Sequence, residues 1–263
     1  MQDRLKDKDD ATLVPLADGK MEALRLVKAM QQKGLTIRLL GGLAVSLRCP
    51  SAGHRALNRV YADLDFVAYK RQARALEKAL QEQGYRADRR FNALHGEQRL
   101  LFFDDAHERQ VDIFLGVFEM CHKLPLERRL ELHPFTLDPA DLLLTKLQIV
   151  QLNTKDLRDM LALLLDFEPK ASTAQPGEEL DMTIMTRLCA QDWGWYTTVQ
   201  DNLERVAQEA QTALEREEAQ LIRERVQTLH QHMRQAPKSV SWKMRDRLGR
   251  RVQWYDLPEE VRR

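Results

Sequence analysis

Three acidic residues lie within short apolar runs of the sequence, where a carboxylate is costly unless it has a partner. Asp63 and Asp65 belong to the run ADLDF, and Asp112 belongs to VDIF. Residues i and i+2 of a β-strand point to the same side, so a strand through ADLDF presents two carboxylates side by side. Two such charges repel each other unless a cation neutralises them, and carboxylate oxygens are ligands that suit Mg²⁺ and Mn²⁺. The three residues therefore predict a metal site. The alternative is that Asp-x-Asp is a solvated strand face.

A pair of glycines lies upstream of these acids. In LLGGLAV, residues 39–45, an apolar run ends at Gly41 and Gly42 and can continue as a helix, which is the pattern of strand, tight turn and helix. Such a turn leaves backbone N–H groups open at a helix N-terminus, where a phosphate can approach without a side chain in the way. The ordered set of glycine turn, paired carboxylates and third acid matches a two-metal phosphoryl-transfer site.

In order and spacing, these motifs resemble the DNA polymerase β-like nucleotidyltransferase superfamily, whose signature is an h-G-[GS] turn, [DE]-h-[DE] and a third acid on a later strand. Within it, the chain is most similar to the AbiEii-type nucleotidyltransferases, which include toxins of toxin–antitoxin and phage-defence systems. Those proteins carry an arginine before Asp-x-Asp, as Arg59 is here, and a helical lysine followed by [RK]-D-x-x-D. Lys146 and the run KDLRD at 155–159 stand in those places. The chain departs from the pattern at Gly42, where many members have serine, and at Tyr61, where serine or threonine is common.

The resemblance implies transfer of a nucleotide from an NTP, such as ATP, to a hydroxyl acceptor, with pyrophosphate as the leaving group. Asp63 and Asp65 would hold a Mg²⁺ or Mn²⁺ ion that bridges the triphosphate. Asp112 would help to bind a second ion and would activate the acceptor hydroxyl. The residues implied to contact the nucleotide are Gly41, Gly42, Ser46, Arg59, Lys146 and Asp156. For Ser46 the alternative is an ordinary solvated serine on an amphipathic helix.

The helical lysine and the acids that follow it are predicted to share a cleft. An apolar stripe runs from Asp138-Pro139 to Phe167 and predicts a helix over this length. By 100° steps Lys146, Asn153 and Asp156 lie on one face of it, whereas Asp159 sits further round. The alternative is an exposed charged face with i, i+4 ion pairs.

Composition limits the class of protein. The chain has 263 residues, with 41 Lys and Arg against 40 Asp and Glu, so no overall charge drives it onto nucleic acid or membrane. Three widely spaced cysteines argue against disulfides and are predicted to be buried thiols, and scattered histidines make zinc a poor fit. The absence of a signal-like or bilayer-spanning stretch predicts a cytoplasmic protein without a membrane partner.

The elements that must position these residues predict an α/β (α+β) fold: a nucleotidyltransferase-like mixed sheet with flanking helices, plus a helical C-terminal domain. We expect a flexible tail over 1–17, a catalytic core over 18–135 and a helical domain over 136–263. The predicted strands are 36–40, 60–69, 99–105 and 109–117, the last two as a hairpin. The predicted helices are 20–33, 71–84, 138–167, 181–190 and two within 196–235.

The final segment is locally basic and aromatic. Residues 234–263 hold nine Lys or Arg against four Asp or Glu, together with Trp242, Trp254 and Tyr255. Such a tail suits single-stranded RNA, and the alternative is that its tryptophans pack onto the body. The sequence WGWY at 193–196 is predicted to anchor the start of a helix. The acceptor stays open between tRNA, a small molecule such as an aminoglycoside, and a protein. A toxin role would bring an antitoxin partner, and a non-catalytic NTP-binding or regulatory scaffold is the alternative function.

Overall fold

A five-stranded mixed sheet organises the first half of the chain in the computed structural model, which describes residues 14–257. The strand order is β1-β2-β5-β4-β3. β2 and β5 run parallel, and the other neighbouring strands are antiparallel. The strands of this sheet are β1 (Ile37–Leu40), β2 (Leu64–Ala68), β3 (Arg86–Ala87), β4 (Arg99–Asp104) and β5 (Arg109–Leu115). Two small sheets are formed by β6 (Val117–Glu119) with β7 (Lys123–Pro125) and by β8 (Pro169–Lys170) with β9 (Leu180–Asp181).

Helices surround the sheet and make up most of the second half. The helices before residue 135 are α1 (Gly19–Gln32), α2 (Gly41–Arg48), α3 (Ala73–Glu82) and α4 (Arg89–His95). Those after it are α5 (Pro139–Leu147), α6 (Thr154–Asp166), α7 (Met182–Gln191), α8 (Trp193–Ala213), α9 (Arg216–Gln235) and α10 (Val240–Leu248). Short 3₁₀ turns lie at Pro50–Gly53, Lys70–Gln72, Glu127–Arg129 and Gly249–Arg251. This confirms the predicted fold class, a mixed α/β sheet with flanking helices and a helical C-terminal region.

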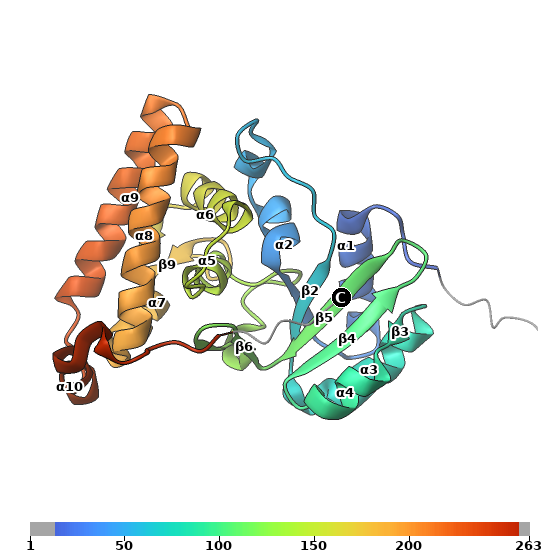
Figure 1. The fold of residues 1–263 in the computed structure, drawn as a ribbon. Coiled ribbons are helices and arrows are strands. Elements are labelled where there is room, and N and C mark those ends of the chain that lie inside the picture. Colours follow the sequence, from blue (N-terminus) through green and yellow to red (C-terminus); the bar gives the residue numbers. More distant parts are fainter. Residues whose placement is uncertain (1–13, 258–263) are drawn as a thin grey trace, which may run out of the picture.

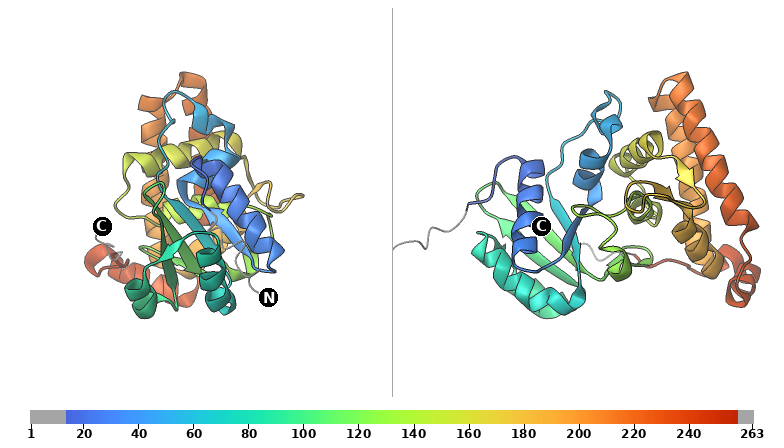
Figure 2. Two further views of the ribbon diagram at one scale, coloured as in Figure 1. Left: turned by 90° about the vertical axis from the view of Figure 1, so that its right-hand side faces the viewer. Right: turned by 180° about the vertical axis from the view of Figure 1, so that it is seen from behind.

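The arrangement places α2 at the junction of the two halves. Figure 1 shows the sheet on one side, the long pair α8 and α9 on the other, and α2, α5 and α6 between them; the view from behind in Figure 2 shows the same order. α2 contacts β1, β2, α5 and α6. A single cluster of buried apolar residues runs from Ala23 to Met233, so the helical half packs on the same core as the sheet.

Local signals in the sequence explain several element ends. Asp18 caps α1 by accepting from the Met21 N–H at 2.8 Å, and Gly34 follows the helix with a positive φ of 71°. α2 begins directly where β1 ends, at Gly41. The predicted pair of helices within 196–235 is confirmed as α8 and α9. Trp193 and Trp195 are buried at the start of α8, as predicted.

The free edge of β1 is covered by a chain segment without helix or strand. Leu39 N–H donates to the Phe135 carbonyl at 2.9 Å, and Leu137 N–H donates to the Leu39 carbonyl at 3.0 Å. Residues 135–137 therefore pair with the outer strand of the sheet, next to the start of α2. Such cover removes an exposed edge that could pair with another chain.

Four expectations need correction. The predicted helix over 138–167 is broken, because α5 ends at Leu147 and α6 starts at Thr154, with Asn153 as its N-cap. The predicted strand over 60–69 is confirmed only for Leu64–Ala68, so Asp63 lies just before it. The elements β3, α4, β6 and β7 were not predicted from the sequence. The predicted linker over 168–181 contains the short parallel pair β8 and β9.

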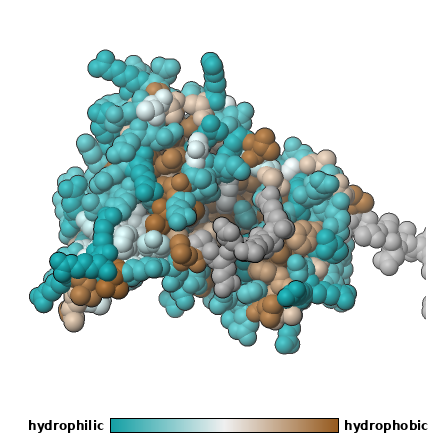
Figure 3. Space-filling view, viewed as in Figure 1, coloured by the Kyte–Doolittle hydropathy of each residue, from teal (hydrophilic) through white to brown (hydrophobic). Residues whose placement is uncertain are grey.

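The cysteines and the surface agree with what the composition predicts. The three cysteines, Cys49, Cys121 and Cys189, are free and buried, as predicted. Over residues 14–257 no helix is both long and apolar enough to cross a membrane. The face drawn in Figure 3 is largely hydrophilic, with a hydrophobic patch at the lower left over α10. Val240, Met244 and Leu248 are its exposed apolar residues. The predicted tail over 1–17 lies largely outside the described residues.

Candidate active site

Two of the three predicted carboxylates are neighbours across the centre of the sheet. In the parallel pairing of β2 and β5, Asp65 is in register with Asp112. Neighbouring strands lie about 4.8 Å apart and residues in register point to the same face, so the two side chains are adjacent. Asp63 lies two residues before Asp65, just ahead of β2. Asp112 is 2% exposed.

A pocket of about 510 Å³ opens beside these acids and brings five of the predicted residues together. Its walls include Gly41 from α2, Asp63 and Asp65 from β2 and its approach, Lys146 from α5 and Asp156 from α6. The pocket therefore lies where the sheet meets the helical half. Carboxylates and a lysine in the lining of one pocket suit a ligand that carries both metal and phosphate.

Gly41 is required at the end of β1 for two reasons. Its φ is 71°, in the left-handed region that side chains other than glycine rarely adopt. A Cβ atom at this position would lie 2.4 Å from Oδ2 of Asp65. No side chain caps α2, whose N-cap residue is Leu40. The first N–H groups of a helix lack intrahelical partners and attract anions, so this end of α2 suits a phosphate at the pocket wall.

Lys146 is held in the pocket wall by two acids from α6. Its Nζ lies 2.9 Å from Oδ1 of Asp156 and 3.0 Å from Oδ2 of Asp159. Burial alone would lower the pKa of Lys146, but Asp159 and Asp156 outweigh it, and the pKa is raised above its ordinary value. The lysine therefore carries its charge at neutral pH. The expectation that Asp159 lies away from the lysine is wrong, because the break between α5 and α6 turns both acids toward Lys146.

Three of the residues implied to bind the nucleotide do not line this pocket. Arg59 donates two hydrogen bonds to Asp159, at 2.9 and 2.7 Å, and its guanidinium lies 4.4 Å from the ring centre of Tyr61. Gly42 packs against that guanidinium: a Cβ at Gly42 would lie 1.6 Å from Nη2 of Arg59. The Ser46 hydroxyl donates to the Leu43 carbonyl at 3.0 Å. Arg59 and Gly42 thus pack around Asp159, which pairs with Lys146, and the roles of all three residues at a ligand stay predictions.

The electrostatics of the carboxylates favour a bound cation. Burial and the neighbouring Asp112 raise the pKa of Asp65 to about 7, because its charge is desolvated and repelled. A divalent cation at Asp63 and Asp65 would remove that repulsion, and their oxygens are suitable donors. Over residues 14–257, however, no three His, Cys, Asp or Glu side chains are already grouped as a cation site. Of the three predicted metal ligands, Asp63 and Asp65 line the pocket, so these two carboxylates would hold such an ion.

Sequence reasoning missed Arg99. Its Nε donates to Oδ1 of Asp112 at 2.7 Å, while Nε2 of Gln110 donates to Oδ2 of Asp112 at 2.7 Å. Arg99 also lines the pocket. It begins β4 and pairs with Phe114 of β5, two residues from Asp112. The register of the predicted hairpin was the signal that could have placed Arg99 beside the third acid.

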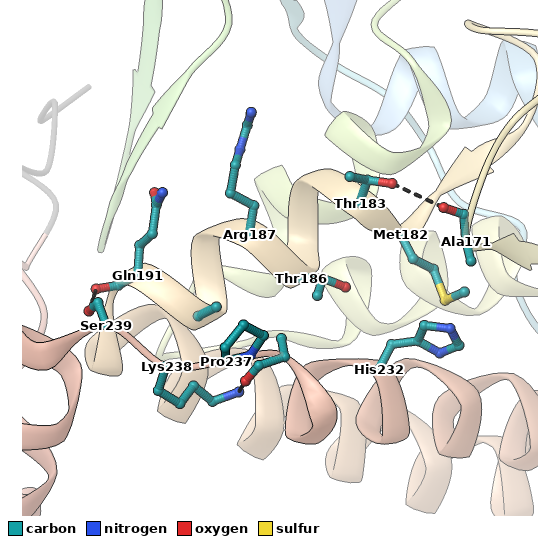
Figure 4. Close-up of a pocket in the computed structure, with 12 residues that line it drawn as sticks. Ala171, Met182, Thr183, Thr186, Arg187, Gln191, His232, Pro237, Lys238 and Ser239 are labelled. Atoms are coloured by element: carbon teal, nitrogen blue, oxygen red, sulfur yellow. Dashed lines mark hydrogen bonds between the residues drawn. The ribbon is translucent and has the colours of Figure 1, made fainter.

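A second pocket lies apart from the carboxylates. It has a volume of about 540 Å³ and lies between α7, α9 and the segment that leads to α10 (Figure 4). Among the side chains that line it are Met182, Arg187, His232 and Lys238, and no carboxylate is among them. In Figure 4 the Lys238 ammonium turns back toward the end of α9, where it donates to the Ala236 carbonyl at 3.1 Å. This pocket contains none of the residues predicted to do chemistry.

Comparisons with known proteins leave the family of the chain open. No family model and no curated protein matches its sequence. Among solved structures, the solution structure of the antibiotic-resistance factor ANT(2'')-Ia is similar over 65% of this chain and 92% of that one, with 13% sequence identity and a TM-score of 0.38. Because both values are low, this similarity assigns neither a family nor an activity, and the function must be argued from the site.

The basic aromatic tail packs onto α8. Nε1 of Trp254 donates to Oγ1 of Thr198 at 3.0 Å, and its ring meets that of Trp193 edge to face at 5.9 Å. Trp242 meets Tyr196 in the same way at 5.4 Å. Of the two alternatives left open by the sequence, packing of the tryptophans onto the body is the one observed.

Proposed function

We propose that this protein is a nucleotidyltransferase that depends on a divalent metal ion and transfers a nucleotide from an NTP to a hydroxyl group. The observation that carries the proposal is the pocket lined by Asp63, Asp65, Gly41 and Lys146, with Asp112 in register with Asp65 and buried just behind the wall. Carboxylates, a helix N-terminus and a lysine then face one volume. That set of groups suits a metal-bound triphosphate better than any other common ligand.

The residues divide the work as follows. Gly41, at the start of α2, and the charged Lys146 bind phosphate oxygens and fix the triphosphate against the sheet. Asp156, with Asp159 behind it, keeps Lys146 extended and protonated. Asp63 and Asp65 would hold Mg²⁺ or Mn²⁺, which supplies Lewis-acid neutralisation of the triphosphate charge when bound.

Transfer itself needs a base near the α-phosphate. In the proposed step the acceptor oxygen bonds to the α-phosphorus, the bond from that phosphorus to the bridging oxygen breaks, and pyrophosphate leaves with the electron pair. Asp112 takes the proton from the acceptor hydroxyl at a carboxylate oxygen. In the structure each of its two oxygens accepts one hydrogen bond, from Arg99 and from Gln110, and the pair with Arg99 stabilises its charged form.

That engagement of Asp112 also favours a second candidate, a scaffold that binds an NTP without transferring it. A third carboxylate that stays paired with Arg99 would leave a binding pocket with no base. The two candidates differ in one measurable respect, because the scaffold binds NTP in a way that depends on Asp65 but never forms a covalent product.

The site does not select an acceptor, so the acceptor class and the biological role are separate proposals. RNA such as tRNA, a small hydroxyl-bearing molecule and a protein are all compatible with a pocket open to solvent. The resemblance to AbiEii-type enzymes adds a toxin role with an antitoxin partner. Free thiols at all three cysteines suit a reducing cytoplasm.

The experiment is incubation of the purified protein with each α-labelled NTP and Mg²⁺ against total RNA, a small-molecule pool and the protein itself. We expect label to enter one acceptor class, and expect Asp65→Asn to abolish labelling while its melting temperature stays close to that of the wild type. NTP binding without label in any class would favour the scaffold. If the protein binds no NTP, or binds it equally well after Asp65→Asn, both candidates are contradicted.

A further inference from the structure

Arg99 lies between the candidate active site and a neighbouring pocket of about 530 Å³, and it lines both. Among the described residues that line the two pockets, it is the one positively charged side chain that they share. The other residues that line both are Phe114, Met120 and Leu257. The guanidinium lies 4.9 Å from the ring centre of Phe114 and 5.7 Å from that of Phe91. Arg99 therefore rests on aromatic faces, with open volume on two sides.

The same side chain neutralises the third carboxylate. Nε of Arg99 lies 2.7 Å from Oδ1 of Asp112, whose side chain is 3% exposed, while that of Arg99 is 24% exposed. The acid is therefore buried in its strand, and the arginine is the more exposed partner of the pair. A cation at Oδ1 of Asp112 would lie close to the guanidinium and be repelled by it, so the two positive groups compete for this carboxylate.

We propose that Arg99 is a positioning residue that holds the Asp112 carboxylate and competes with a divalent cation for it. When a cation and a nucleotide are bound at Asp63 and Asp65, Arg99 gives up Asp112 and turns along Phe91 into the neighbouring pocket. The third carboxylate thus becomes available only in the loaded site. This inference rests on the proposed function, because it assumes that Asp63 and Asp65 bind the cation.

The pairing has an energetic logic. Without Arg99, Asp112 would be a buried carboxylate next to Asp65 with only a neutral donor, Gln110, to satisfy it. Burying an unpaired charge of this kind costs several kcal/mol. Arg99 removes that cost when no cation is present, at the expense of cation affinity. Removal of the arginine should therefore strengthen cation binding and weaken the fold.

The test is Mn²⁺ binding to the full chain without nucleotide, measured by electron paramagnetic resonance. Arg99→Gln should bind Mn²⁺ about tenfold more tightly than the wild type, since one competing charge is gone. Arg99→Lys, which keeps a charge but has a shorter reach and no fork, should fall between the two. Unchanged or weaker binding by Arg99→Gln would overturn the proposal.

The chain offers a matched control in Arg86. This arginine also begins a strand of the same sheet, donates to an aspartate, Asp105, at 2.7 and 2.8 Å, and lies 4.9 Å from the ring centre of Phe103. It does not line the pocket. Arg86→Gln removes the same charge from a pair that is exposed and outside the pocket, and it should leave Mn²⁺ affinity as in the wild type.

A double variant separates competition for Asp112 from a general effect of charge. If Arg99 acts through Asp112, Arg99→Gln gives no gain in Mn²⁺ affinity in an Asp112→Asn background. An equal gain in both backgrounds would overturn the proposal. Asp65→Asn tests the assumption that Asp63 and Asp65 bind the cation. Mn²⁺ affinity that is unchanged in Asp65→Asn would contradict the proposed metal site itself. Mn²⁺ binding that requires Asp65 but is unchanged in Arg99→Gln would contradict only the inference about Arg99.

Discussion

Arg59 occupies the space that a side chain at position 42 would need, and this explains a departure of the chain from its resemblance. The guanidinium is held by Asp159 and stacked on Tyr61, so it cannot move aside without loss. Glycine at 42, arginine at 59 and tyrosine at 61 are therefore one packing solution.

Gly42→Ser should destabilise the protein by about 1–3 kcal/mol, because it displaces Arg59 from Asp159. Helix propensity alone would predict the opposite sign. Urea denaturation gives the free energy of unfolding. In an Arg59→Ala background the same change should cost far less. Gly53→Ser is the control, since nothing lies within 4 Å of a Cβ there. Equal costs of Gly42→Ser in both backgrounds would refute this account.

Asp159 and Asp156 both pair with Lys146, but they are expected to behave differently. Asp159 is 2% exposed and also binds Arg59, so Asp159→Asn leaves two cations short of a partner and should cost about 3–5 kcal/mol of stability. Asp156→Asn leaves Lys146 its second acid and should cost about 1–2 kcal/mol.

Because Asp156 lines the pocket and Asp159 does not, Asp156→Asn should have the larger effect on NTP affinity relative to its effect on stability. Calorimetric NTP titration beside urea denaturation measures both quantities. A larger loss of stability in Asp156→Asn than in Asp159→Asn would contradict the assignment of the larger stabilising role to Asp159.

At the scale of elements, the segment that covers β1 contains His133, whose surroundings favour the uncharged imidazole. Nδ1 of His133 accepts from the Thr136 N–H at 3.0 Å, and Thr136 forms a bridge to Leu39 of β1. Burial, together with the Arg48 guanidinium, lowers the pKa of His133 to about 4. The cover of the sheet edge is thus tied to a titratable group.

This histidine should make stability depend on pH. The unfolded chain binds a proton at an ordinary pKa of about 6.5 and the folded chain only near 4, so the contribution is complete above pH 6.5 and is lost as the pH falls toward 4. In urea denaturation at pH 5 and pH 7.5, His133→Gln should lose less stability on acidification than the wild type. Parallel losses in the two proteins would rule this out.

How far the sequence predicts the elements depends on whether a signal is local. The end of α1 at Gly34, the hairpin of β4 and β5, and the two helices α8 and α9 follow from turn residues and periodicity. The break between α5 and α6 was missed because apolar residues continue across it. Asn153, which caps α6 by accepting from the Lys155 N–H at 2.8 Å, was the available signal.

The candidate site shows the same limit. The period-two pattern of ADLDF predicts that Asp63 and Asp65 lie side by side, whereas the placement of Asp112 beside them follows from the resemblance and from the sheet order, which pairs β2 with β5. The partners of those acids come from long-range packing. Only the register of the hairpin places Arg99 beside Asp112, and the distance between Arg59 and Asp159 along the chain hides their pair.

At the scale of the whole molecule, the helical half closes one side of the pocket and carries a basic surface. Arg245 of α10 is structural: it donates to the Gly249 carbonyl at 2.6 Å and lies 4.7 Å from the ring centre of Trp193. Lys243, Arg247 and Arg251 are exposed. These three exposed cations are candidates for phosphate contacts.

If the acceptor is RNA, replacing Lys243, Arg247 and Arg251 with Gln should flatten the dependence of RNA affinity on salt by up to about three phosphate contacts. NTP affinity should not change, since none of them lines the pocket. Fluorescence anisotropy with a single-stranded RNA over a salt series measures this slope. An unchanged slope would remove the surface from the acceptor site and favour a small-molecule acceptor.

The measurement that tests the central claim most directly compares ATP and other NTPs labelled at the α- or the γ-phosphate, in wild type and Asp65→Asn, with the acceptor pools above. Nucleotide transfer predicts that α-label becomes covalently attached to an acceptor while γ-label leaves as pyrophosphate, and that Asp65→Asn attaches neither. Covalent γ-label, or α-label that persists in Asp65→Asn, would contradict a site built on Asp63, Asp65 and Asp112.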